Sequence, residues 1–125
     1  MNLFVITPYQ SDPLYEIKKA IVLNLSKANG LDTYYASNYL IDGKLDVEKS
    51  IKLYKNADFF IADLSYERPS CYFEVGYVQA MNKPIFLIAR KSTVIHQVQN
   101  IDTIRLYHDL LSYSELITSI LKHKI

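Results

Sequence analysis

The chain has 125 residues, with 14 basic and 13 acidic side chains, one cysteine, no tryptophan and 11 tyrosines. This length predicts a single domain over residues 1–125 that buries a core of its own. The net charge of +1 argues against a partner such as a nucleic acid polymer or an anionic membrane. The lone cysteine excludes a disulfide framework and a cysteine-based zinc site.

The first residues carry neither the basic segment nor the small-residue cleavage site of a secretory signal peptide. No stretch approaches the roughly 18 apolar residues that a membrane-spanning helix needs. We therefore expect a cytoplasmic domain without a membrane partner.

Apolar runs and segments of helical periodicity alternate along the chain. Runs of consecutive apolar residues are typical of strands buried on both faces, whereas apolar residues three or four positions apart are typical of helices. The predicted elements, in chain order, are a strand over Leu3–Thr7, a helix from Asp12 to Ala28, a strand over Leu31–Ala36, a helix from Asp46 onward, a strand over Ala57–Asp63, a helix over Pro69–Asn82, a strand over Pro84–Ala89, a short strand over Ile101–Tyr107 and a helix over Leu110–Leu121.

Capping residues mark several helix ends. Asp12 followed by Pro13 predicts the N-cap and first position of the first helix, and Asp46 predicts the N-cap of the second. Gly30 predicts the end of the first helix. The residues predicted to face inward on the second and last helices are Val47, Ile51, Tyr54, Leu111, Leu116 or Ile117, and Ile120 or Leu121.

Strict alternation of strands and helices predicts right-handed βαβ units and a parallel sheet covered by helices on both faces. Five strands favour a flavodoxin-like three-layer α/β sandwich with strand order 2-1-3-4-5 over a full Rossmann fold. Such sheets bind ligands beyond the carboxyl ends of their strands, at the switch point between strands 1 and 3. The segments expected there are Pro8–Asp12, Asp63–Glu74 and Arg90–Ser92, with Ser37–Asp42 as a wall.

Several kinds of site are excluded by what the chain lacks. With only three glycines, neither a G-x-G-x-x-G loop nor a Walker A motif is possible. His96, His108 and His123 do not have the spacing of metal ligands. We therefore predict neither a metal nor a cofactor.

The segment Asp63–Glu74 is the richest in reactive side chains. Glu74 falls near the start of a predicted helix, where the helix dipole favours negative charge, so we expect its carboxylate to stay ionised. An ionised carboxylate suits a covalent nucleophile or the stabilisation of an oxocarbenium ion. For an isolated glutamate, this position is more typical of a surface residue that complements the helix dipole.

The central part of the chain resembles the nucleoside 2-deoxyribosyltransferase-like superfamily. The resemblance rests on Ala-Asp-x-x-Ile-Ala-Asp-Leu-Ser at 57–65, Pro-Ser-x-x-Phe-Glu-Val-Gly-Tyr at 69–77 and Lys-Pro-Ile at 83–85. Within that superfamily, the pattern is most similar to a TIR-like group of predicted nucleotide-binding proteins. Residues 4–18 and 102–107 resemble the first strand and helix and the final strand of that group. The resemblance implies a flavodoxin-like fold and an enzyme of N-glycosidic bonds.

The resemblance also implies roles for individual residues. In the deoxyribosyltransferases, the glutamate of this block attacks the anomeric carbon, and nucleotide N-glycohydrolases and NAD-cleaving TIR domains use a glutamate on the corresponding helix. This role carries over to Glu74, and Asp63 would position the ribose or the nucleobase. Pro8 and Tyr9, which follow the first strand, would contact the substrate.

Two positions depart from the pattern of the superfamily. Arg68 stands where the deoxyribosyltransferases have an aspartate that binds the base, and Ser70 stands where the TIR-like group has an asparagine. An arginine binds phosphate through two parallel hydrogen bonds. Arg68 and Ser70 therefore favour a nucleotide or dinucleotide substrate over a free nucleoside.

Tyrosines lie in the segments that are expected around the strand ends. We predict that Tyr9, Tyr39, Tyr66 and Tyr72 form an aromatic wall for a nucleobase. The alternative functions are a TIR-like NAD-cleaving domain and a nucleotide-sensing signalling or defence module that binds without turnover. Because enzymes of this superfamily often complete their sites across a subunit interface, the resemblance also implies a homodimer or a larger assembly.

Overall fold

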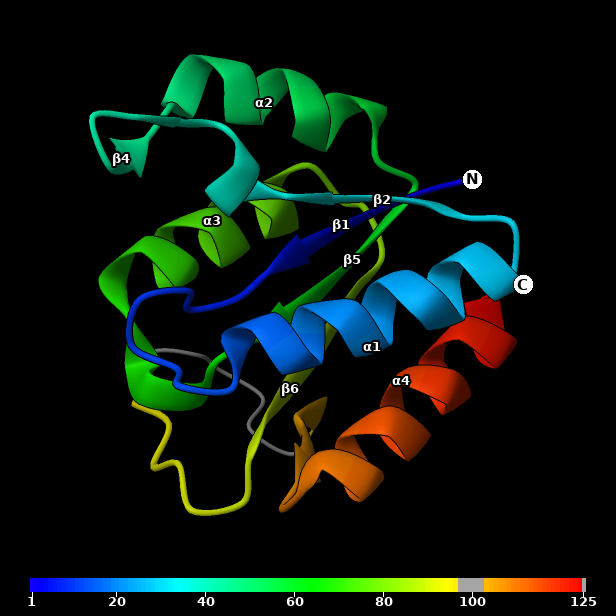
Figure 1. Ribbon diagram of the computed structural model, residues 1–125. Coiled ribbons are helices and arrows are strands. Elements are labelled where there is room, and N and C mark those ends of the chain that lie inside the picture. Colours follow the sequence, from blue (N-terminus) through cyan, green and yellow to red (C-terminus); the bar gives the residue numbers. More distant parts are fainter. Residues whose placement is uncertain (97–102, 125) are drawn as a thin grey trace.

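The computed structural model describes residues 1–96 and 103–124. Five parallel strands form the main sheet (Figure 1). They are, in spatial order, β2 (Asp32–Tyr35), β1 (Asn2–Ile6), β5 (Phe59–Asp63), β6 (Ile85–Arg90) and β7 (Arg105–Tyr107). This is the order 2-1-3-4-5 of a flavodoxin-like α/β fold, which confirms the predicted fold class. Of the predicted last strand, Ile101 and Asp102 lie outside the described residues.

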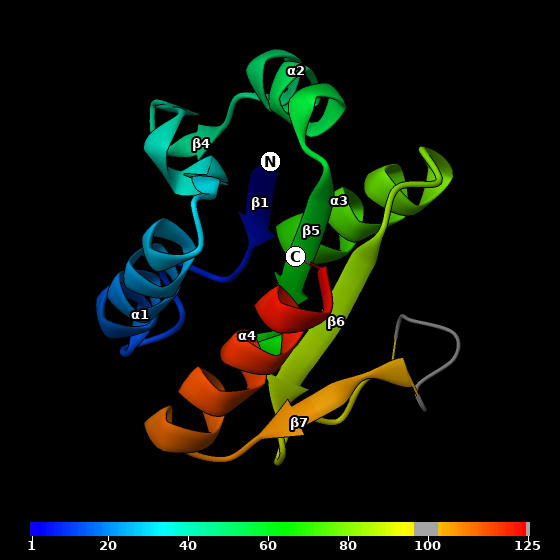
Figure 2. The same ribbon diagram turned by 90° about the vertical axis from the view of Figure 1, so that its right-hand side faces the viewer.

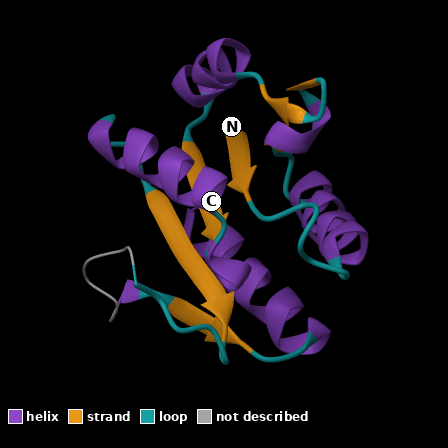
Figure 3. Ribbon diagram, turned by 90° about the vertical axis from the view of Figure 1, so that its left-hand side faces the viewer, coloured by secondary structure: helices purple, strands orange, loops and turns teal. Residues whose placement is uncertain are grey.

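Helices cover both faces of the sheet, as Figures 2 and 3 show from two opposite sides. One face carries α1 (Tyr15–Ala28) and α4 (Leu110–Lys124), and the other carries α2 (Val47–Asn56) and α3 (Pro69–Ala80). No helix among the described residues is long and apolar enough to cross a membrane.

The central strands are buried on both sides because successive side chains point to opposite faces of a sheet. In β1, Leu3 and Val5 pack in the cluster that includes residues of α1 and α4, whereas Phe4 and Ile6 pack in the cluster that includes residues of α2 and α3. All four side chains are at most 2% exposed. This double burial explains why the strands are continuous apolar runs in the sequence.

Of the two aspartates predicted to cap a helix, one does so and the other does not. Asp46 caps α2, because its carboxylate accepts a hydrogen bond from the Lys49 amide at 3.1 Å. The prediction that Asp12 caps α1 is wrong, since the helix begins only at Tyr15. The Asp12 carboxylate instead accepts a hydrogen bond from the Leu14 amide at 2.9 Å and forms a turn ahead of the helix.

Two of the residues predicted to face inward are exposed. Val47 is 44% exposed and Leu111 is 69% exposed. Both lie in the first turn of their helix, and the first buried side chains follow only at Ser50 in α2 and Tyr113 in α4.

A short hairpin between β2 and α2 was not among the predicted elements. Its strands are β3 (Leu40–Ile41) and β4 (Lys44–Leu45), which pair antiparallel. Asp42 and Gly43 connect them with φ angles of 50° and 75°, and Asp-Gly is a strong signal for a two-residue hairpin turn. The signal was therefore present in the sequence.

Lys83 closes the C-terminal end of α2. Its ammonium donates to the carbonyl oxygens of Tyr54 at 3.0 Å, Lys55 at 2.5 Å and Ala57 at 2.8 Å. The last carbonyls of a helix have no partner within the helix, so this one side chain satisfies groups that otherwise need water. Lys83 therefore also holds the backbone of Tyr54, whose side chain contacts the candidate site described below.

We expect the substitution Lys83→Met to lower the free energy of unfolding by about 1.5–3 kcal/mol, the usual value for hydrogen bonds to a charged group. Lys52→Met is the matched control, because Lys52 lies exposed on the same helix, and it should change stability by less than about 0.5 kcal/mol. Urea unfolding followed by circular dichroism measures both. Equal effects of the two substitutions would contradict a capping role for Lys83.

Candidate active site

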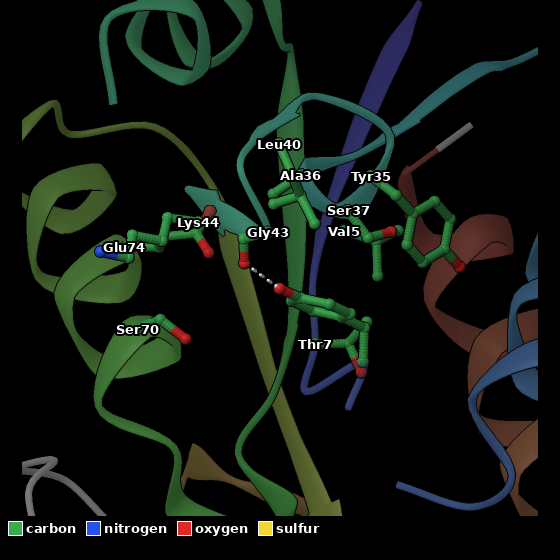
Figure 4. A pocket seen from close by; sticks show the side chains of 11 residues that line it. Val5, Thr7, Tyr35, Ala36, Ser37, Leu40, Gly43, Lys44, Ser70 and Glu74 are labelled. Carbon is green, nitrogen blue, oxygen red and sulfur yellow. Dashed lines mark hydrogen bonds between the residues drawn. The ribbon is translucent and has the colours of Figure 1, made fainter. Parts of the chain in front are cut away.

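A cavity of about 230 Å³ opens at the carboxyl ends of β1 and β2 (Figure 4). Its walls come from the end of β1 and the following loop, the end of β2 and the following turn, the hairpin β3–β4, and the first half of α3. The lining residues are Val5, Thr7, Tyr9, Tyr35, Ala36, Ser37, Leu40, Gly43, Lys44, Ser70 and Glu74. The cavity thus lies at the edge of the sheet where the topology predicts a ligand site.

Glu74 is the acidic side chain among the described residues that line this cavity. The side chain lies in the second turn of α3 and is 4% exposed. Burial raises the pKa of Glu74 to about 7, and a hydrogen bond from Tyr54 opposes this shift. Glu74 is therefore less fully ionised than its place near the start of a helix predicts, because burial disfavours the charged form. At neutral pH both the protonated and the ionised forms are present.

Tyr54 on α2 holds the carboxyl group of Glu74. Its hydroxyl donates a hydrogen bond to Oε2 of Glu74 at 2.5 Å. The ring is fixed by edge-on contacts with Phe4, at a centroid distance of 5.0 Å, and with Phe60, at 6.1 Å. Burial and the neighbouring carboxylate raise the pKa of Tyr54 well above its usual value, so the hydroxyl remains a donor. Helical spacing placed Tyr54 on the buried face of α2, but spacing gives no information about the partner of its hydroxyl.

Tyr9 and Ser70, which the sequence nominated, also line the cavity. The Tyr9 hydroxyl donates to the carbonyl oxygen of Gly43 at 3.1 Å and so connects the loop after β1 with the hairpin (dashed line in Figure 4). Ser70 lies next to Pro69 at the start of α3, on the same helix as Glu74. The predicted wall after β2 is present too, since Ser37 and Leu40 contribute to the lining.

The structure does not place Asp63 in this cavity. Asp63 is 1% exposed and accepts hydrogen bonds from the Tyr107 hydroxyl at 2.6 Å and from the Ser65 amide at 3.0 Å. The Lys18 ammonium lies 3.9 Å from Asp63 and 2.6 Å from Asp12. Burial raises the pKa of Asp63, and these hydrogen bonds and the charge of Lys18 oppose the shift. Asp63 thus joins the end of β5 to α1 and β7.

Three other nominated residues also lie outside the cavity lining. Pro8 is buried beside Tyr9, and Arg68 is exposed at the position before α3. The Tyr72 hydroxyl donates to Oε1 of Glu67 at 2.9 Å. Tyr72 thereby faces a separate surface hollow, away from the residues that surround Glu74.

The predicted aromatic wall is wrong for most of its members. Of the four tyrosines, only Tyr9 lines the cavity, and Tyr35 joins it from the end of β2. The ring of Tyr39 instead lies under the Lys49 ammonium, and the Tyr66 hydroxyl accepts a hydrogen bond from Arg90. Strand-end position in the sequence does not determine the direction in which a ring points.

Among the described residues, no three histidine, cysteine, aspartate or glutamate side chains come together as metal ligands do. Burial raises the pKa of the Cys71 thiol to about 12, so Cys71 remains protonated. A protonated thiol is a poor nucleophile, and Glu74 remains the candidate for covalent chemistry.

No protein-family model matches the chain, and no curated protein sequence does. Among solved structures, the 2-deoxyribosyltransferase from Bacillus psychrosaccharolyticus aligns with a TM-score of 0.69 at 11% identity, covering 97% of this chain and 96% of that one. The CMP N-glycosidase BcmB from Clostridium botulinum aligns with a TM-score of 0.63 at 18% identity, covering 94% and 98%. The similarity to the TIR-like group stays a prediction. The chain shares the fold of these two proteins over nearly its entire length.

Proposed function

We propose that this protein breaks or exchanges the N-glycosidic bond of a nucleoside or nucleotide, with Glu74 as the catalytic carboxylate. The observation that carries the proposal is the placement of Glu74. It is the one acidic side chain among the described lining residues of the cavity, it is buried, and Tyr54 fixes its orientation. The shared fold with a deoxyribosyltransferase and a CMP N-glycosidase supports this proposal.

The proposed reaction has two steps. First, the ionised carboxylate attacks C1′ of the sugar while the C1′–N bond breaks, and the electron pair of that bond leaves with the base. The negative charge of Glu74 stabilises the oxocarbenium-like transition state, and Tyr54 holds Oε2 so that Oε1 remains for the sugar. Second, water or another base attacks C1′, and the bond between C1′ and Glu74 breaks with its electron pair returning to the carboxylate. The proton that the attacking group loses is taken up by the base that departed in the first step. Water yields a hydrolase, and a second base yields a transferase.

The size of the cavity limits the substrate. Small-molecule pockets usually measure about 300–1,000 Å³, and this cavity of about 230 Å³ holds a sugar with part of a base. A nucleoside or mononucleotide fits this volume better than a dinucleotide such as NAD. Thr7 and Ser37 offer hydroxyl groups for the sugar, and the half-buried Tyr9 ring offers apolar surface for the base.

The second candidate function is nucleotide binding without turnover. One observation favours it: among the described lining residues, no second acid stands beside Glu74 to protonate the departing base. In this case the protein binds a nucleotide and releases no base from it.

The deciding experiment incubates the purified protein with deoxynucleosides, nucleoside monophosphates and NAD, and follows free base by chromatography. Base release from a nucleoside or a monophosphate supports the proposed enzyme. Release from NAD alone supports the TIR-like alternative. Nucleotide binding by calorimetry without any base release supports the binding module. Sedimentation in the same samples tests the predicted homodimer.

We expect the substitution Tyr54→Phe to move the pH dependence of base release. The hydrogen bond from Tyr54 lowers the pKa of Glu74, so its loss raises that pKa further. A hydrogen bond to a charged group worth roughly 1.5 kcal/mol corresponds to about one pH unit. The rising limb of the pH–rate profile should therefore shift by about one unit to higher pH. A uniform loss of rate at every pH would contradict this role.

A further inference from the structure

The hairpin β3–β4 contributes a positive charge to the cavity. Lys44 is the one cationic side chain among the described residues that line it. The ammonium group of Lys44 forms no hydrogen bond or ion pair with a described residue, Glu74 included. An unpaired cation on the wall of a cavity is available to a ligand.

The backbone that carries Lys44 has a defined position over the cavity. Lys44 pairs with Ile41 across the hairpin and follows directly on the turn at Asp42 and Gly43. The carbonyl of Gly43 is fixed by the hydroxyl of Tyr9 on the opposite loop (Figure 4). Lys44 is therefore attached to an ordered element next to the cavity, although its side chain is exposed.

Across the cavity from the hairpin lies the start of α3. Ser70 lines the cavity there and offers its hydroxyl group, whereas Pro69 has no amide hydrogen and the amides of Cys71 and Tyr72 already donate to the carbonyl oxygen of Arg68. The positive charge for an anion in this cavity therefore comes from Lys44. Arg68, which the sequence nominated for a phosphate, is exposed and is not part of the lining.

We propose that Lys44 makes this cavity select phosphorylated nucleosides over neutral nucleosides, by binding the phosphate group between the hairpin and the start of α3. The assignment rests on the proposed function, because it concerns the substrate of the same cavity. It moves the phosphate-binding cation from Arg68 to a residue in an element that the sequence prediction did not contain.

The test is calorimetric and does not depend on turnover. Wild-type protein is titrated with each common nucleoside and with its monophosphate, and inorganic phosphate is titrated separately. At least one monophosphate should bind roughly 10- to 100-fold more tightly than its nucleoside, the range expected of a charge-assisted hydrogen bond. Inorganic phosphate should bind more weakly than that monophosphate, because it makes none of the contacts of the base and sugar.

Three substitutions make the test specific. Lys44→Met should reduce the preference to less than about threefold and leave nucleoside affinity unchanged, whereas Lys44→Arg should keep it because the charge remains. Lys52→Met, the exposed lysine control on α2, should behave as wild type. Circular dichroism confirms that each variant is folded.

Three binding results would each overturn the proposal. The first is a wild-type protein that binds no monophosphate more tightly than its nucleoside. The second is a preference that survives Lys44→Met, and the third is a preference that disappears in Arg68→Ala. Base release is measured on the same samples. Equal release of base from nucleosides and monophosphates would support the proposed enzyme and contradict the role of Lys44. A binding preference that depends on Lys44, without any base release, would support the role of Lys44 and contradict the proposed enzyme.

Discussion

Replacing Glu74 by glutamine should lower the rate of base release by at least about a thousandfold, the order of loss expected when a covalent nucleophile is removed. Glutamine has the same size and its carbonyl can still accept the hydrogen bond from Tyr54. It carries no negative charge for the oxocarbenium-like transition state and forms no ester with C1′. The loss should therefore appear in the chemical step while substrate binding changes little.

Single-turnover kinetics with chromatographic detection of the base measures this loss. Glu48→Gln is the matched control, because Glu48 is an exposed glutamate on α2 and lies outside the cavity lining. It should release base at the wild-type rate. A Glu74→Gln protein that stays within tenfold of wild type would remove Glu74 from the mechanism.

The same substitution should make the fold more stable at alkaline pH. Burial raises the pKa of Glu74 from 4.5 to about 7 in the folded protein. Between these two values the folded state holds more protons than the unfolded state, so the free energy of unfolding falls as the pH rises. Above pH 7 the full cost of the buried charge is present, and about 2.5 pKa units correspond to about 3 kcal/mol. Glutamine is uncharged, so the Glu74→Gln protein does not lose this stability at high pH.

Urea unfolding of both proteins at pH 4.5, 6 and 8 measures the effect. The Glu74→Gln protein should match wild type near pH 4.5 and exceed it by up to about 3 kcal/mol at pH 8. Taking the difference between the two proteins cancels other titrating groups such as Asp63, which both share. A difference that does not vary with pH would show that the Glu74 carboxyl titrates at its ordinary pKa.

The fold could be predicted from the sequence because its central strands are buried on both faces. The residues Phe59 to Ala62 of β5 are apolar on both faces, which is compatible with a parallel sheet covered by helices and with little else. The register of the helices was harder to predict. In α4, apolar residues occur on more than one side, and the packing of Tyr113 against Tyr107, at a centroid distance of 4.9 Å, determines which of them are buried.

The candidate site was predictable in its location and only partly in its chemistry. Glu74 and Tyr9 lie together at the cavity because topology brings the strand ends to one edge of the sheet. The protonation of Glu74 depends on its burial and on Tyr54, which is 20 residues away along the chain. Asp63 is separated from its partner Tyr107 by 44 residues. Hydrogen bonds between residues so far apart in the sequence cannot be predicted from a local sequence pattern.

The buried charges around Lys18 have a consequence for how this protein can evolve. Lys18 lies between Asp12 and Asp63, all three nearly inaccessible to water, and its ammonium also contacts the Tyr107 hydroxyl at 2.7 Å. Loss of Lys18 leaves two buried carboxyl groups without a cation, and loss of both aspartates leaves the buried ammonium without an anion, whereas replacement of the whole set by apolar side chains is far better tolerated. Drift at these positions must therefore be concerted. In divergent descendants of this chain, Lys18 and its two aspartates should be kept together or lost together.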